Sequence, residues 1–565
     1  MSTTEVDARS TIVPRDNVWA TATIAVFISL SLILALIGLG HAALWDDEAS
    51  VAITGRNFVN LGHMTGWDGR NLYGYHNGML VDHTLRPINP PLDILIAATG
   101  FRIFGESNWS ARFLFVLFGI GAEVVFAAVM RQLFRQNRSI QLFAVGLLAF
   151  STPFLLAIRN CRYYAPAVFF ALLALYSYYR AKEREKPVDF VFFAISLACL
   201  FYAQYLAAVC FICAIAAAHI LVYRKSFTGS YAGFAGSAAL LAGLTVPYAL
   251  AFHIWHRPDL AGGVYSLNRL TFLGWHLERL FSMGALSTVM LGALILFIVF
   301  KKSDGEINLH AAAWSTMIVA YILAIDLLMP NPLKEERYLW PVAPLAYGLM
   351  ALPLSIIAKR SNSLAIALTV LLTSTTLLSA FPFRIEMPLL LPAYIQEVSH
   401  PYPTGTQGVA EFLAVTAKQD DVVFACPEYM NYPLLYYVGD KVRIGDLIDS
   451  SSPLAGEIGK MRAPFLNKST TFPTWFIAYG NQPTDLLNPN GTQGWLDFFS
   501  RKHPEGGRAV EYRYEPVEKL NVFWGQSQRS ESGLHSFGPV NNFDRSREAV
   551  TIYRRITISS ATKTD

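Results

Sequence analysis

Apolar runs about as long as a lipid bilayer is thick recur along this 565-residue chain. A run of roughly 17 to 25 residues with few charges predicts a helix that crosses the membrane, because a backbone in lipid must satisfy its own hydrogen bonds. With 53% hydrophobic and only 15% charged residues, the chain is too apolar for an average soluble protein. We therefore predict a polytopic α-helical membrane protein with about eleven transmembrane helices. They are expected at residues 18–40, 109–130, 140–157, 163–179, 188–204, 206–223, 232–254, 284–300, 310–329, 338–357 and 363–382.

Basic residues recur in every second loop between these apolar runs. The positive-inside rule places such loops, together with the N-terminal tail, in the cytoplasm. An odd number of spans leaves the C-terminus outside. The net charge of +4 comes largely from these basic loops and reflects topology, so no nucleic-acid partner is expected. The basic loop residues are Arg131, Arg135, Arg138, Arg180, Lys182, Arg184, Lys186, Arg224, Lys225, Lys301, Lys302, Lys359 and Arg360. The segments expected outside are 41–108, 159–162, 255–283 and 330–337.

The composition becomes polar and turn-rich near residue 386, after the last apolar run. We therefore divide the chain into a membrane catalytic domain at 1–385, which includes exterior loop 41–108, and an exterior α/β domain at 386–565. The five cysteines form neither a disulfide framework nor a zinc pattern. In the exterior domain, β-branched and aromatic runs predict strands at 421–426, 441–444, 474–479, 511–514, 520–524 and 549–556, with a short helix at 432–438.

Acidic and basic side chains gather in the exterior loops. Asp46, Asp47 and Glu48 directly follow the first apolar run, and ionisable groups at a membrane boundary often mark a functional site. A carboxylate can accept a proton from a hydroxyl, and cations can stabilise the charge on a departing phosphate. The mixture therefore suits group transfer from a lipid phosphate, with snorkelling at helix ends as the alternative role of the cations. The exterior cations considered for this role are Arg86, Arg159, Arg162, Lys334 and Arg337.

Four short motifs follow one another in a recognisable order. WDDEA at 45–49 comes after the first span, and PINPPL at 87–92 precedes the second. AIRNCRYYA at 157–165 and RYLWP at 337–341 come later, the last followed by Pro344. The motifs resemble those of the GT-C glycosyltransferases, in particular the family 39-like branch that contains the protein O-mannosyltransferases and the lipid A aminoarabinose transferase. The resemblance covers about residues 18–385 and implies a GT-C fold for the membrane domain.

The resemblance also implies roles for individual residues. Asp47 would be the general base and Glu48 would support it or position the acceptor, while the adjacent Asp46 leaves the assignment open by one residue. The aminoarabinose-transferase relatives carry a lysine where this chain has Asn89, so other cations would bind the donor phosphate. These are Arg337, Arg162, Lys334 and Arg86. Further substrate contacts are expected from Tyr164, Tyr338, His83 and Asn89.

We interpret the chain as an enzyme of the bacterial inner membrane that transfers a monosaccharide, with inversion, from a polyprenyl phosphate to an exterior acceptor. The expected acceptor is lipid A, lipopolysaccharide core or another cell-envelope glycan, and a protein hydroxyl is the alternative. A lipid-linked sugar transporter or flippase is the rival class. It is disfavoured because the chain has no duplicated halves and its acids lie at a membrane face. A non-catalytic envelope assembly protein is a further alternative.

No cofactor is expected to be required, and no metal site is predicted. His63, His76, His83 and Asp82 lie in the first exterior loop, but their spacing is not that of a defined metal site. A divalent cation is the alternative, held chiefly by Asp46, Asp47 and His83.

Overall fold

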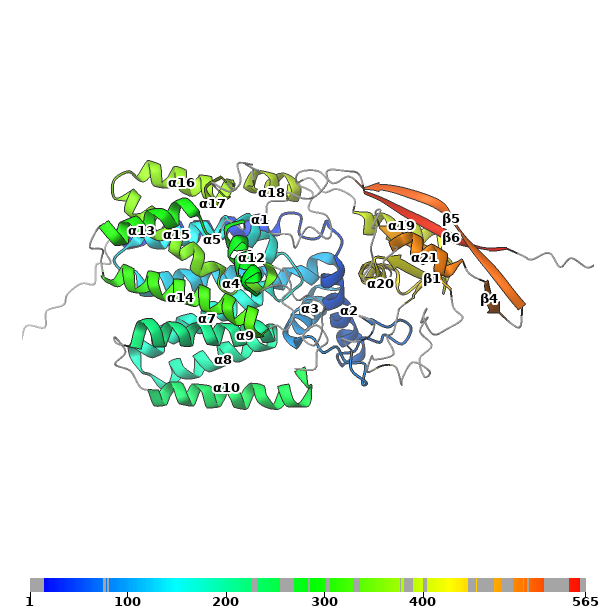
Figure 1. Ribbon diagram of the computed structural model, residues 1–565, viewed down its shortest axis with the longest axis horizontal. Helices are drawn as coiled ribbons and strands as arrows, with labels where there is room; N and C mark the ends of the chain where they lie inside the picture. The colour runs from blue at the N-terminus through cyan, green and yellow to red at the C-terminus, as the bar shows by residue number, and fades with distance from the viewer. Residues whose placement is uncertain are drawn as a thin grey trace, which may run out of the picture.

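A bundle of helices and a mixed sheet lie at opposite ends of the elongated molecule in the computed structural model (Figure 1). Helices α2 (Asp46–Leu61) and α3 (Pro91–Phe104) lie between the two. The residues that the structure describes are 15–74, 78, 81–224, 231–254, 269–282, 285–300, 305–328, 336–375, 377–380, 390–399, 404–445, 454, 472–479, 491–500, 502–505, 508–522 and 548–558.

The bundle consists of helices of very different lengths. Its N-terminal half contains α1 (Arg15–Leu36), α4 (Asn108–Leu133), α5 (Arg138–Ala149), α6 (Thr152–Ile158), α7 (Tyr164–Arg184), α8 (Pro187–Ala203), α9 (Tyr205–Ala218), which continues as a π-helix (His219–Tyr223), and α10 (Tyr231–Ala251). Its C-terminal half contains α12 (Arg269–Ser282), α13 (Thr288–Phe300), α14 (Gly305–Leu328), a 3₁₀ turn (Glu336–Leu339), α15 (Ala343–Ala358), α16 (Asn362–Ser374), α17 (Leu377–Ala380) and α18 (Leu390–Ser399).

Within the described residues, five helices are long and apolar enough to cross a membrane, and a bent pair could supply a sixth span. Three further apolar helices, α8, α15 and α16, are shorter. The chain is therefore a multi-pass membrane protein, while the number of about eleven spans stays a prediction.

One predicted span is broken. Residues 140–157 form α5 and α6, which meet at an angle of 60°. Ser151 caps α6 by accepting a hydrogen bond from the Phe154 amide, and Pro153 occupies the first turn. Proline has no amide hydrogen and disfavours helix in the residue before it, so a new helix begins here in a new direction.

Helix α2 is packed inside protein. It contacts α3 on one side and α20 (Asn431–Val438) of the exterior domain on the other. At Gly55 an added Cβ would lie 3.2 Å from the Cβ of Ala97, so glycine permits the close approach of α3. The helix ends at Gly62, whose φ of 77° is the left-handed conformation usual after a helix.

The domain after the bundle, which the sequence predicts to be exterior, contains in its described residues a six-stranded sheet of order β2-β1-β3-β6-β5-β4. The strands are β1 (Val422–Cys426), β2 (Arg443–Ile444), β3 (Trp475–Tyr479), β4 (Lys502–Glu505), β5 (Arg508–Val522) and β6 (Glu548–Ile558). Strands β1 to β3 pair in parallel and the others are antiparallel, with α19 (Gly405–Thr416), α20 and α21 (Gly491–Phe499) as the domain's helices. Strands lie at the predicted positions, but 511–514 and 520–522 belong to one long strand, β5, and β4 was not predicted.

Candidate active site

The acidic motif forms the first turn of α2. Asp46, Asp47 and Glu48 are its first three residues, and Trp45 precedes the helix in extended conformation. The indole Nε1 of Trp45 donates to Oδ1 of Asn160 over 2.7 Å, which ties this turn to the loop between α6 and α7. Backbone amides at a helix N-terminus stabilise negative charge, so the turn is a favourable place for carboxylates.

Asp47 lies between two arginines that come from distant parts of the chain. Its Oδ2 is 2.6 Å from Nη1 of Arg337, in the 3₁₀ turn before α15, and 3.0 Å from Nη2 of Arg162, in the loop before α7. The Asp47 side chain is 4% exposed, and the arginine side chains are 20% and 11% exposed. The structure therefore brings together three of the residues that the motif order singled out.

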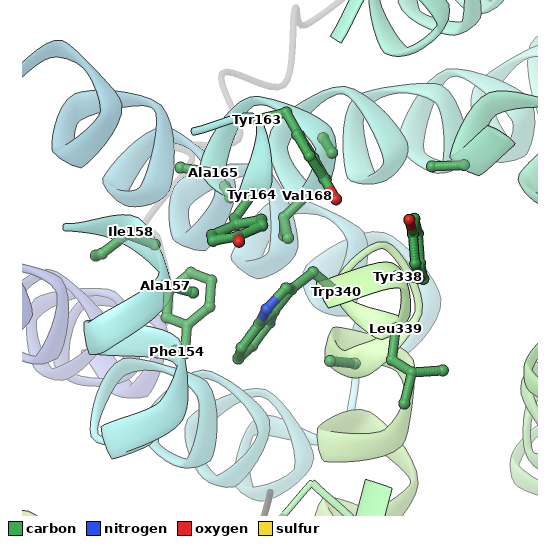
Figure 2. Close-up of a cluster of buried hydrophobic side chains, with 14 of the residues drawn as sticks. Phe154, Ala157, Ile158, Tyr163, Tyr164, Ala165, Val168, Tyr338, Leu339 and Trp340 are labelled. Carbon is green, nitrogen blue, oxygen red and sulfur yellow. The ribbon is translucent and has the colours of Figure 1, made fainter. Parts of the chain in front are cut away.

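The segments that carry these arginines pack against each other. Figure 2 shows Trp340 between Tyr164 and Phe154 on one side and Tyr338 on the other. The Tyr338 carbonyl accepts a hydrogen bond from the Tyr321 hydroxyl of α14 over 2.8 Å. The ring centres of Trp340 and Phe154 of α6 lie 6.1 Å apart, so this buried cluster packs the segment after Arg337 against the helix that leads to Arg162.

Glu48 is fully buried and makes a two-point ion pair with Arg112 of α4. Oε1 accepts from Nε over 2.8 Å, and Oε2 accepts from Nη2 over 2.5 Å. The amide of Cys161 also donates to Oε1 over 2.8 Å. The same guanidinium donates to the carbonyls of Leu39, Ala42 and Ala43. Glu48 therefore supports the acidic turn from inside the protein and does not face the exterior.

Asp46 differs from Asp47 in its electrostatic environment. Burial raises the pKa of the Asp46 carboxyl well above its ordinary value, and the neighbouring negative charge of Asp47 raises it further. Burial thus works against the charged form of Asp46, whereas Asp47 forms ion pairs with two arginines. This contrast supports Asp47 as the proton acceptor of the pair.

Asp93, which the sequence interpretation missed, adds a further carboxyl near the site. It lies in the first turn of α3, directly after the PINPPL motif, and is 2% exposed. Burial raises the pKa of Asp93 to about 6, against the opposing effect of Arg162. The signal in the sequence was an acid two residues after the double proline. The sequence does not show how deeply this acid is buried.

The pKa of Asp93 predicts a pH-dependent stability. Because the folded-state pKa lies above the ordinary 3.8, the folded protein holds a proton that the unfolded chain has lost between pH 4 and 6. The stability contributed by protonated Asp93 is present below pH 4 and is lost as pH rises to 6, by up to about 3 kcal/mol. Thermal unfolding of detergent-solubilised protein between pH 4 and 7.5 measures this change. Asp93→Asn should flatten the slope and unfold at higher temperature at pH 7; an unchanged slope would contradict the assignment.

Removing the partner of Glu48 should be severely destabilising. In Arg112→Ala a fully buried carboxylate loses its cation, which typically costs about 3–5 kcal/mol. Arg135→Ala is the matched control, because it breaks an ion pair with Glu183 whose side chains are 63% and 46% exposed. Such a surface pair contributes less than about 1 kcal/mol. Thermal unfolding of both variants makes the comparison, and equal losses would show that the Glu48–Arg112 pair is not an anchor.

The other predicted site residues lie in different surroundings. The guanidinium of Arg86 faces α10, with its Cζ 3.8 Å from the ring centre of Phe252. Arg159 donates to the carbonyls of Ala35, Ile37 and Gly38 at the end of α1, which is a structural role. His83 is exposed, Asn89 is partly buried, and Tyr164 is buried at the start of α7. Lys334 and His76 lie outside the described residues.

Across the described residues, no group of three or more His, Cys, Asp or Glu side chains could hold a metal ion.

The exterior domain also reaches the acidic turn. The Tyr437 hydroxyl of α20 accepts a hydrogen bond from the Leu44 amide over 2.7 Å and donates to Oδ1 of Asn108 over 2.6 Å. The Tyr73 ring of the first exterior loop packs edge-on against Tyr432, 5.0 Å between ring centres. The loop, the exterior domain and the start of α2 therefore form one packed region.

Comparison with known proteins yields a family match and several fold matches. Residues 88–249 match the family model of the dolichyl-phosphate-mannose-protein mannosyltransferases. A curated relative, an uncharacterized protein of Aquifex aeolicus, is 29% identical over 171 residues, which are 30% of this chain and 31% of the relative. The chain thus matches about a third of that relative's length.

Two solved structures share the fold at low identity. ArnT from Cupriavidus metallidurans, bound to undecaprenyl phosphate, has a TM-score of 0.53 and 13% identity, over 82% of this chain and 94% of ArnT. The oligosaccharyltransferase of Archaeoglobus fulgidus in its apo form has a TM-score of 0.52 and 11% identity, over 95% and 89% of the two chains. The resemblance predicted from the four motifs is confirmed, and the chain has the fold of the GT-C membrane glycosyltransferases.

Proposed function

We propose that this protein transfers a monosaccharide from a polyprenyl-phosphate donor to a hydroxyl group of an acceptor on the exterior side of the bacterial inner membrane. The observation that carries the proposal is the placement of Asp47 between Arg162 and Arg337 at the N-terminus of α2. One carboxylate and two cations are the groups that inverting transfer from a phosphate requires. The family match to enzymes that use dolichyl phosphate mannose, and the undecaprenyl phosphate bound to ArnT, support a lipid phosphate donor.

Asp47 would act as the general base. Its carboxylate takes the proton of the acceptor hydroxyl while the acceptor oxygen forms a bond to the anomeric carbon of the sugar. The bond from that carbon to the phosphate oxygen breaks, and its electron pair leaves with the phosphate. A phosphate leaves without a strong general acid, so the two-carboxylate arrangement of glycoside hydrolases is not needed.

Arg162 and Arg337 would stabilise the departing phosphate. In the structure both bind Asp47, and a donor phosphate, with more negative charge and several acceptor oxygens, competes for the same guanidinium groups. Donor binding would therefore draw at least one arginine away from Asp47. That exchange leaves a lone pair of Oδ2 available for the acceptor proton only when the donor is present.

Lipid A, lipopolysaccharide core or another cell-envelope glycan is the proposed acceptor, with a protein hydroxyl as the alternative. A transporter or flippase of lipid-linked sugars would need a charged path from one membrane face to the other. The Asp47 cluster lies where the helix bundle meets the packed region formed by the first loop and the sheet domain, and this position favours chemistry at one membrane face.

The direct test is a transfer assay. Purified full-length protein is incubated with radiolabelled polyprenyl-phosphate sugars and bacterial envelope extract, and label in the acceptor fraction is measured. Transfer by wild-type protein and none by Asp47→Asn is the expected result. Movement of labelled donor across vesicle membranes without formation of a labelled product would instead establish the transporter.

A further inference from the structure

A hollow opens between the C-terminal half of α2 and α20. Its volume is about 770 Å³, within the usual range of small-molecule sites. Asn57 and Asn60 of α2, Asn108 of α4, and Tyr436 and Tyr437 of α20 are among the residues that line it. Asn60 is 13 residues beyond Asp47 in the same helix, which is about 20 Å at 1.5 Å per residue. The hollow is therefore separate from the Asp47 site.

This hollow has no excess of positive charge, and its two cations are already engaged. Arg56 and Arg70 face three acids, Asp68, Glu106 and Asp440, in the lining. Arg56 lies 3.5 Å from Glu106 and donates to the Tyr436 carbonyl. Arg70 lies 3.0 Å from Asp420 and donates to the Lys441 carbonyl. Recognition of phosphate calls for an excess of cations aimed at the ligand, so this hollow does not suit a phosphorylated or otherwise anionic group.

The remaining lining suits an uncharged ligand with many hydroxyl groups. The exposed Asn60 amide offers both a donor and an acceptor, which matches hydroxyl groups that also do both, whereas the amides of Asn57 and Asn108 already donate to backbone carbonyls. Tyrosine rings provide flat apolar faces with a polar tip, against which the apolar face of a sugar ring can pack. Asn60 is exposed and Tyr437 is partly exposed, so both an amide and an aromatic side chain are open to a ligand.

The wall of the hollow is also bonded to the segment before the acidic turn. Tyr437 bonds to the Leu44 amide and to Asn108, and Asn108 in turn donates to the carbonyls of Gly40 and Ala42. We infer that the hollow binds an uncharged saccharide portion of the acceptor, at a distance from its reacting hydroxyl. This inference rests on the proposed function and narrows the acceptor class to glycans with a neutral saccharide part. Binding energy gained there would help to place the reacting end at Asp47.

Binding of neutral saccharides to the full-length protein in nanodiscs tests the inference. The probes are gluco- and manno-oligosaccharides of two to four units, with the bis-phosphorylated glucosamine disaccharide of lipid A as the anionic comparison, and calorimetry measures affinity. Asn60→Trp fills the hollow from an exposed position on α2. Glu411→Trp, at an exposed position of α19 that does not line the hollow, is the matched control.

We expect a neutral oligosaccharide to bind wild-type protein and the Glu411→Trp variant equally, and to bind Asn60→Trp at least about tenfold more weakly. Affinity for the polyprenyl-phosphate donor should be the same in all three proteins. Tighter binding of the bis-phosphorylated disaccharide, no binding of any neutral probe, or equal binding by Asn60→Trp would overturn the inference. Saccharide binding that Asn60→Trp abolishes, in a protein that shows no transfer, would retain this site and reject the proposed function.

Discussion

Asp47→Asn is expected to abolish sugar transfer while leaving donor binding and the fold largely intact. The amide keeps the shape of the side chain and can still accept hydrogen bonds from Arg162 and Arg337, but it cannot take a proton. Loss of a general base typically lowers turnover by about 10²–10⁴-fold. Turnover is measured with labelled donor and acceptor, donor affinity with the donor alone, and stability by thermal unfolding.

Asp46→Asn is the matched control for this experiment. Burial works against the charged form of Asp46 in the folded protein, so its replacement by an uncharged amide should change turnover far less. If Asp47→Asn kept half of the wild-type turnover and Asp46→Asn did not, the base would be one residue earlier in the chain.

Arg337→Ala should produce the second large loss. Removing one group that stabilises developing negative charge typically lowers turnover by about 10²–10³-fold, and donor affinity should fall as well. Arg337→Lys keeps the charge but loses the planar fork that can bind two phosphate oxygens, so its activity should lie between those of wild-type and Arg337→Ala.

Arg86→Ala distinguishes a specific role of Arg337 from a general effect of removing an exterior cation. Arg86 stacks on Phe252, away from the contacts of Asp47, so its loss should leave donor affinity nearly unchanged. A folded Arg337→Ala protein with normal donor affinity and turnover would reduce Arg337 to a structural side chain. Weakened donor binding by Arg86→Ala would move the phosphate site toward α10.

The order of motifs in the sequence predicted which residues meet, because that order reflects a fold in which distant segments share one membrane face. Asp47 and Arg337 are 290 residues apart and form an ion pair. The sequence alone did not assign the partners of Asp47. It grouped Arg86 and Arg159 with Arg162, because these arginines carry the same charge. Only packing separates Arg162, beside Asp47, from Arg159, which binds the carbonyl groups at the end of α1.

The buried partners were harder to predict for a different physical reason. Arg112 lies near the start of an apolar span, where a snorkelling arginine is common. Nothing in the sequence around Arg112 indicates that it binds Glu48 instead. The depth of Asp93 and the bend between α5 and α6 likewise depend on which helices pack against them. The strands of the exterior domain were easier, because short β-branched and aromatic runs between turns carry a local signal.

The ion pair between Asp47 and Arg337 also has a consequence for biosynthesis. Arg112 is only 64 residues beyond Glu48, so that carboxylate can be neutralised early, whereas the second cationic partner of Asp47, Arg337, comes 290 positions later. At synthesis rates of about 5–20 residues per second, this delay is roughly 15–60 s. The nascent chain therefore holds its acidic turn in place before it has a complete set of reactive groups, and catalytic competence is acquired only when most of the membrane domain has emerged from the ribosome.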